Sequence, residues 1–110
     1  MKYWYEGIGD RYKQLDSASQ ILNVISDLIK ASRFVEKDLN LVKRHIYGAL
    51  VLLDYMIEDV KWRDRLKELL RFREAVCSLL TDRPYGTFDN IIRAGIMLDA
   101  EAYKILKNVR

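Results

Sequence analysis

The chain has 110 residues, of which half are hydrophobic, and it carries a formal net charge of +3 at pH 7. This is enough apolar material for one core, so we expect a single domain over residues 1–110 with an aromatic and glycine-containing leader at residues 1–9. Such a mild charge is not typical of proteins that live on nucleic acid. The longest nearly uncharged apolar run, residues 46–57, contains Asp54 and is too short to span a membrane. A lone cysteine, and an N-terminus without the pattern of a secretory leader, predict a cytoplasmic location.

The spacing of the apolar residues indicates the fold class. Only one proline and five glycines interrupt the chain, and apolar residues recur at intervals of three and four almost throughout. This pattern predicts an all-α protein. Short connections make successive helices antiparallel neighbours, so we expect an up-down antiparallel four-helix bundle that self-associates.

The first two helices have recognisable starting residues. The first is expected to begin near Asp10 or Asp16 and to end near Ala31. The second is expected to begin at Asp38, whose carboxylate can accept hydrogen bonds from free backbone amides, and to end near Ile57.

The third and fourth helices are separated by a clear break. The third is expected to open at Asp59 and to continue to about Leu80. The sequence TDRPYGT, residues 81–87, then interrupts the chain, because its proline disfavours a helical residue before it and its glycine permits a tight turn. Thr87 can cap a fourth helix whose apolar stripe continues to Leu106.

The second helix is apolar on more than one side, which a single four-helix core does not explain. Exposed apolar patches usually mark a partner surface, so this surplus predicts the interface of a symmetric homodimer. In the alternative, loops or the aromatic leader cover this face within one subunit. The predicted interface residues are Tyr47, Val51, Leu52, Tyr55 and Met56.

The segment KWRDRLKELLRFRE, residues 61–74, contains six basic and three acidic residues and therefore holds a net charge of +3. Acidic residues are interleaved with the basic ones, which is typical of a solvated helix face with ion pairs one turn apart. The alternative is a surface that contacts phosphates of a nucleic acid. The candidate nucleic-acid-binding residues are Lys61, Arg63, Arg65, Lys67 and Arg71.

The sequence contains no recognisable catalytic or metal-binding constellation. His45 is the only histidine and lacks the Glu-x-x-His spacing of a di-iron bundle. Cys77 lies on an apolar stripe and is best explained as a small buried hydrophobe. The acidic cluster of Asp54, Glu58 and Asp59 could bind a divalent ion, but such surface clusters are common. We therefore expect no catalytic residues, no metal and no cofactor.

The segment LLRFREAVCSLL, residues 69–80, followed by an aspartate-containing turn and a last helix, resembles the corresponding region of HEPN domains. That family consists of all-α proteins that often act as RNases or as nucleotidyltransferase partners in toxin and defence systems. Its active motif is an arginine followed a few residues later by a histidine. Here Ser78 stands where the histidine would follow Arg73, and no histidine lies beyond His45. The resemblance therefore implies a helical domain without RNase activity.

Two charged residues fall on apolar stripes. Arg73 lies between Leu69 and Val76 on the third helix, and Asp99 lies on the stripe of the fourth. Because an isolated buried charge is costly, and because both positions are equally far from a turn near Gly86, we expect Arg73 and Asp99 to form a buried ion pair. The pair would fix the helix register, or it would line a polar pocket.

Two functions from different classes fit these features. The first is a small helical protein-interaction or scaffold module that forms a homodimer, binds partners through the second helix and the Trp4 and Trp62 regions, and has no catalytic activity. The alternative is a nucleic-acid-associated accessory protein that uses the basic third helix, built on a HEPN-like bundle without the arginine and histidine motif.

Overall fold

The structure is a computed structural model that describes residues 9–108. Across that range the chain forms six α-helices and one 3-10 helix, with no strand, which confirms the predicted all-α class. More helices form than the predicted four, because the first and last predicted helices are each divided in two. The elements are α1 (Gly9–Gln14), α2 (Ser17–Arg33), α3 (Leu39–Glu58), η2 (Val60–Arg65), α4 (Leu66–Ser78), α5 (Phe88–Ile96) and α6 (Ala100–Asn108).

Side-chain caps fix the starts of three helices. Asp16 accepts a hydrogen bond from the amide of Ser19 at the start of α2, and Asp38 accepts two from the first amides of α3. Thr87 forms a reciprocal capping box with Asn90 at the start of α5. A cap satisfies amides that the helix itself leaves without partners, so these starts are set by local sequence.

Two predicted helices differ in form from the expectation. Asp59 does cap the next helical segment, but that segment begins as the 3-10 helix η2 and becomes α-helical only at Leu66. The predicted last helix stops at Ile96 and starts again at Ala100 as α6. The break occurs because the Asp99 carboxylate accepts a hydrogen bond from the amide of Ala102, as the N-cap of a new helix does.

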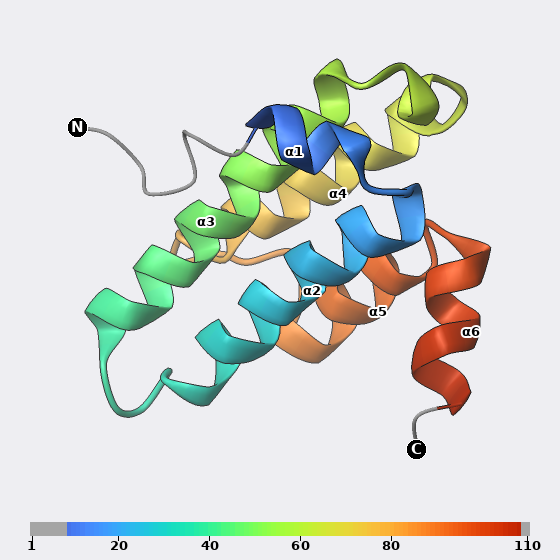
Figure 1. Cartoon of the computed structure of the whole chain (residues 1–110). Coiled ribbons are helices and arrows are strands. Elements are labelled where there is room, and N and C mark those ends of the chain that lie inside the picture. The colour runs from blue at the N-terminus through green and yellow to red at the C-terminus, as the bar shows by residue number, and fades with distance from the viewer. Residues whose placement is uncertain (1–8, 109–110) are drawn as a thin grey trace.

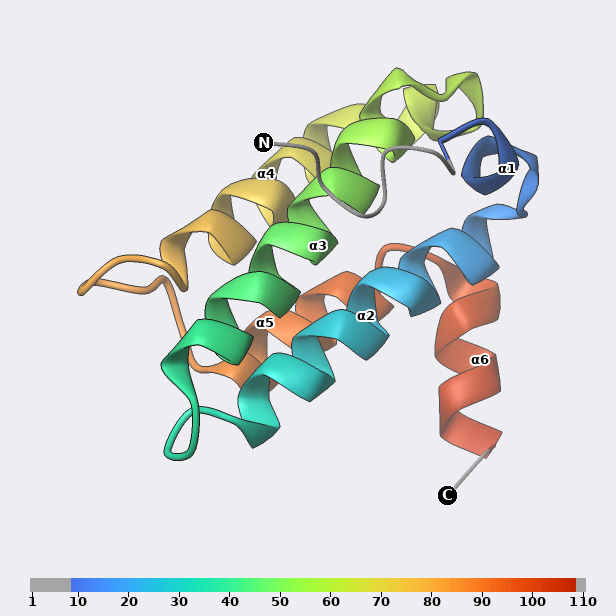
Figure 2. The ribbon, with the colours of Figure 1, turned by 60° about the vertical axis from the view of Figure 1, so that its left-hand side comes forward.

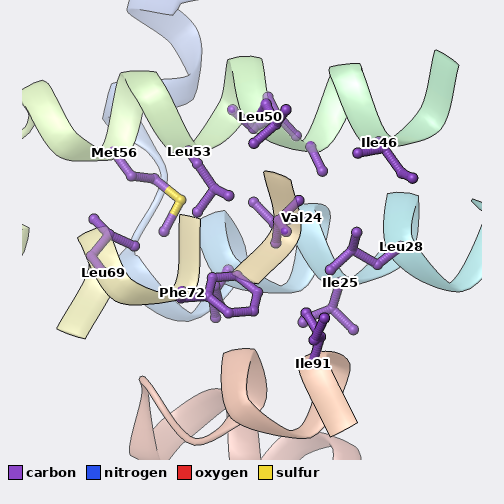
Figure 3. Packing of buried hydrophobic residues seen from close by; sticks show 14 of the residues in the cluster. Val24, Ile25, Leu28, Ile46, Leu50, Leu53, Met56, Leu69, Phe72 and Ile91 are labelled. Carbon is purple, nitrogen blue, oxygen red and sulfur yellow. The ribbon is translucent and has the colours of Figure 1, made fainter. Parts of the chain in front are cut away.

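The core lies between four of the helices. α2 contacts α3, α5 and α6, and α4 contacts α3 and α5. Figures 1 and 2 show that the chain changes direction between α5 and α6, so that α6 runs at an angle to the other helices. Buried side chains from α2, α3, α4 and α5 meet in the centre, as Figure 3 shows for Ile25, Leu53, Phe72 and Ile91.

Gly95 allows α5 to approach its neighbours closely. A Cβ atom at this position would lie 2.5 Å from Cζ of Phe72 and 2.7 Å from Cδ1 of Ile25. Real Cβ contacts are longer than this, so a side chain at position 95 would require Phe72 and Ile25, or α5 itself, to shift.

The predicted dimer face is largely covered within the chain itself. α1 and η2 both contact α3, and Leu52 and Met56 are buried in the core, so their assignment to an interface was wrong. Tyr55 is half-buried, and a Cβ at Gly9 would lie 2.7 Å from its ring. Of the five predicted residues only Tyr47 is exposed, since Val51 is also half-buried. The leader, apart from Gly9, lies outside the described residues.

No helix in the range 9–108 combines the length and the apolar content needed to cross a membrane.

Candidate functional site

A buried group of polar side chains lies where α1, α2 and η2 meet. Gln20 is fully buried, and its Nε2 donates to the backbone oxygen of Tyr12 at 3.0 Å and to Oδ2 of Asp59 at 3.1 Å. Its Oε1 accepts from Nε1 of the fully buried Trp62 at 2.6 Å. The Tyr12 hydroxyl donates to the backbone oxygen of Gln20. Together with Lys61, whose Nζ is 2.6 Å from Oδ2 of Asp59, these residues are called the Gln20 cluster.

The charge of Asp59 is stabilised inside this cluster. Burial acts to raise the pKa of its carboxyl group, but hydrogen bonds from Lys61 and Gln20 outweigh that effect and hold the pKa below its ordinary value. Lys61 also donates from Nζ to the backbone oxygen of Lys13 at 2.8 Å. The cluster therefore joins α1, α2 and η2 through groups that satisfy one another.

A second polar group, the Asp99 cluster of Ser17, Arg65 and Asp99, holds the start of α6. Oδ2 of Asp99 accepts from the Ser17 hydroxyl at 2.7 Å and from Nη1 of Arg65 at 3.1 Å. Arg65 Nη1 also donates to the backbone oxygen of Leu98 at 2.7 Å, and the guanidinium lies 4.1 Å from the centre of the Trp62 ring. Burial acts to raise the pKa of Asp99, but the hydrogen bonds from Ser17, the amide of Ala102 and Arg65 lower it overall.

The predicted pair of Arg73 and Asp99 does not form. Nε of Arg73 is 2.7 Å from Oδ1 of Asp54 on α3, and Asp99 binds Arg65 instead. The prediction assumed one unbroken helix after the turn near Gly86. The break before Asp99 moves that residue to the end of the molecule where η2 and the start of α2 lie.

The five candidate nucleic-acid-binding residues are not equivalent in the structure. Lys61 and Arg65 are engaged by Asp59 and Asp99. Arg63, Lys67 and Arg71 are exposed, and no ion pair within residues 9–108 engages them. Of the five residues in the predicted basic stripe, three therefore remain as exposed cations on the surface of η2 and α4.

The described residues offer little for metal or acid–base chemistry. Within residues 9–108 no three histidine, cysteine or acidic side chains are grouped so that they could hold a metal ion. The acidic trio is dispersed, because Asp54 binds Arg73, Glu58 binds Lys13 and Asp59 binds Lys61.

His45 has a structural environment. Its Nδ1 is 3.3 Å from Oδ1 of the buried Asp27, and its ring stacks on Phe34 with 6.1 Å between ring centres. These contacts join α3 to α2 and to the residue that follows α2. The histidine is therefore part of the packing between these helices.

Cys77 also makes a local contact. It is half-buried, and its Sγ accepts a hydrogen bond from Nη1 of Arg73 at 3.4 Å. It lies on α4 in the partly buried layer around the core, so it is less buried than the sequence predicted.

A groove between α5 and α6 is a concave feature lined by both apolar and cationic side chains. Its volume is about 380 Å³, within the range of ordinary ligand pockets. We call it the α5–α6 groove; its walls are formed by Arg93, Ile96, Met97, Tyr103, Leu106 and Lys107. Met97 is 68% exposed and Tyr103 is 43% exposed, so apolar surface is presented to solvent here.

The groove was missed from the sequence, although a local signal for it was present. Asp99 followed by Glu101 is typical of a helix start, because both acidic groups stabilise free amides in the first turn. This signal predicts two helices in place of the single last helix, with a change of direction between them.

Comparisons with protein-family models, with curated proteins and with solved structures gave no match to this chain. The resemblance to HEPN domains therefore rests on the sequence of residues 69–80 alone. In the structure these residues form most of α4 and the turn after it, with Arg73 bound to Asp54. Ser78 is buried and donates to the backbone oxygen of Ala75.

Proposed function

We propose that this protein is a small helical protein-interaction module that binds a protein partner through the α5–α6 groove. The observation that carries the proposal is the groove itself, a hollow of about 380 Å³ with exposed Met97 and Tyr103 on its walls. Apolar surface that is both concave and exposed is a common feature of partner-binding sites.

The rest of the described structure supports a scaffold role. Among the side chains that the structure describes, those of residues 9–107, every buried nitrogen and oxygen has a hydrogen-bond partner. The two polar clusters therefore stabilise the fold and do not present spare reactive groups. For the scaffold we propose an up-down arrangement of α2 to α5, which is supported by the contacts of α2 and α4 with both α3 and α5.

Protein binding is favoured over nucleic-acid binding because the basic surface is reduced. Lys61 and Arg65 are held by carboxylates, and the three remaining cations have Asp64, Glu68 and Glu74 as sequence neighbours. Phosphate recognition requires cations that can follow the backbone of the nucleic acid without such interruptions.

Matched variants can test the proposed surface. Met97 and Val60 are both 68% exposed, but only Met97 lines the groove. Tagged wild-type protein, M97E and V60E would be used to capture partners from extracts of the source cells, and any captured protein would be purified and its affinity measured directly.

We expect wild type and V60E to bind the same protein with equal affinity and M97E to lose at least about 10-fold, since a charge would be placed in an apolar contact. Equal binding by all three proteins, or no direct binding by wild type, would refute the proposed function. Circular dichroism would confirm that each variant remains folded.

A further inference from the structure

We infer that the partner segment recognised by the α5–α6 groove is an acidic amphipathic helix, with apolar side chains on one face and carboxylates beside them. This inference rests on the proposed function and adds the chemical class of the partner. The evidence is the order of apolar and cationic side chains along the two walls of the groove.

The two walls begin at a shared elbow. α5 ends at Ile96 and α6 begins at Ala100, so residues 97 to 99 connect them, and Figures 1 and 2 show α6 running in a different direction from α5. The elbow is held in place because Asp99 is bound by Ser17 and Arg65. The groove is therefore a preformed feature, which reduces the entropy lost on binding.

Apolar side chains are closest to the elbow, and a cation follows on each wall. Ile96 at the end of α5 and Met97 after it lie nearer the elbow than Arg93 does. On α6, Tyr103 precedes Lys107 by four residues, with Leu106 between them. Four residues correspond to about 6 Å along a helix. An apolar group seated near the elbow would thus have a positive charge about one turn away on each side.

Both cations are available for a partner. No ion pair within the described residues engages Arg93 or Lys107, although the Lys107 Nζ lies 6.0 Å from the centre of the Tyr103 ring. Both side chains are exposed, so they can reach groups outside the groove. A carboxylate on the partner would complement this pair of charges, and a cationic partner would be repelled.

A helix matches this pattern well. The groove lies between two helices and is open to solvent, which suits an amphipathic helix laid along it with apolar residues at i, i+3, i+4 and i+7. Acidic residues one turn from the apolar anchor on such a helix would meet Arg93 and Lys107, because that spacing equals the spacing found on the groove walls.

The test uses three synthetic helical peptides, each about four turns long and with the same apolar stripe. The stripe is flanked by glutamates in the first peptide, by glutamines in the second and by lysines in the third. Fluorescence anisotropy would give their affinities for wild-type protein, for R93Q/K107Q, and for the control K43Q/R44Q, which removes two exposed cations from α3.

We expect the glutamate peptide to bind wild type about 3- to 10-fold more tightly than the glutamine peptide, with a larger margin over the lysine peptide, and to lose this margin at high salt. The R93Q/K107Q variant should bind the glutamate peptide more weakly than wild type does, by the same factor of about 3- to 10-fold. Its affinity for the glutamine peptide should equal that of wild type. The control should change neither. The charge-reversed R93E/K107E should prefer the lysine peptide.

The possible failures are distinguishable. Equal affinity for the three peptides, combined with loss of binding in M97E, would refute the acidic preference and leave the proposed function intact. A preference for the lysine peptide would refute the inference directly. Decanoate binding would be measured by nuclear magnetic resonance shifts of residues in α5 and α6. If decanoate binds at the groove and none of the peptides binds, the inference is overturned in favour of a fatty-acid site. Binding of neither probe would also overturn it.

Discussion

Asp99 binds side-chain groups from two other elements and an amide of its own helix. Its carboxylate accepts hydrogen bonds from Ser17 on α2, from Arg65 at the end of η2 and from the amide of Ala102 in α6. The aspartate therefore combines a helix cap with a tertiary anchor. These two roles can be separated, since asparagine is also a good N-cap but has no charge.

Substitutions at Asp99 should separate the two roles. We expect D99A to lower the free energy of unfolding by about 2–4 kcal/mol, because it removes the cap and takes an acceptor away from the half-buried donors of Ser17 and Arg65. D99N should cost less than half as much, since it keeps the cap. Urea unfolding would measure both, with D82N, at an exposed position in the loop before α5, as a control expected to change less than about 0.5 kcal/mol. Equal losses for D99A and D99N would contradict the separate capping role.

The pH dependence of stability can be predicted from two aspartates, Asp59 and Asp99. The pKa values of Asp59 and Asp99 are lowered in the folded protein, so their contribution is present above the ordinary carboxyl pKa and is lost as the pH falls through the lowered values. We expect the urea midpoint of wild type to fall below about pH 4 and that of D99N to fall less steeply there. Parallel curves would show that Asp99 does not contribute to the acid sensitivity.

Gln20 connects three partners in a fully buried position. Replacing it with leucine keeps the volume but leaves Nε1 of Trp62 without its acceptor and Asp59 without one of its donors. We expect Q20L to lower the free energy of unfolding by about 2–3 kcal/mol. N23L, at an exposed position on the same helix, should change it by less than about 0.5 kcal/mol. Wild-type stability in Q20L would show that the cluster adds nothing to the fold.

At the scale of helices and loops, the sequence predicted the features that depend on neighbouring residues. Asp38 and Thr87 were identified as caps because their partners lie within three residues in the sequence. The pairing of Arg73 was predicted wrongly because its partner, Asp54, lies on another helix and is chosen by the packing of α4 against α3. The start of α6 was missed because the apolar residues keep helical spacing across residues 97–99, a pattern that favours one unbroken helix.

The η2–α4 surface gives a test of the alternative function. Three of the five candidate residues, Arg63, Lys67 and Arg71, have no carboxylate partner within residues 9–108. Because three cations make a small basic surface, we expect wild type and R63Q/K67Q/R71Q to elute from single- and double-stranded nucleic-acid columns at closely similar salt concentrations. A sharply earlier elution of the variant, with a salt slope lower by about 0.9 for each duplex phosphate contact, would support nucleic-acid binding.

At the scale of the whole molecule, part of the surplus apolar surface on α3 is covered within the chain by α1 and η2, as in the alternative to the homodimer interface. The sequence showed that four helices could not cover all of that face. It did not show that α1 and η2 would form and pack on α3, since both are six residues long and their stability comes from contacts such as that of Tyr12 with Met56. Short elements of this kind carry weak sequence signals, although they decide which surfaces remain exposed.

The coverage of α3 by α1 and η2 leads to a prediction of the oligomeric state. Leu52 and Met56 are buried, and Tyr47 is the one exposed residue of the five predicted interface residues, whereas a stable dimer buries roughly 800 Å² per partner. We expect light scattering to give a monomer at about 100 μM, a concentration at which an interface of standard size would associate. A dimer that Y47E converts to a monomer would contradict this expectation and restore an interface on α3.

The two polar clusters become complete at different times during synthesis, because their residues lie at different positions along the chain. The Gln20 cluster needs only residues 12 to 62, whereas the Asp99 cluster joins Ser17 to a residue 82 positions later. A ribosome synthesises the chain from the N-terminus at about 5–20 residues per second, so every member of the Gln20 cluster leaves the ribosome before Asp99 does. The donors on Ser17 and Arg65 remain hydrated until then, and the capping of α6 completes this end of the domain last.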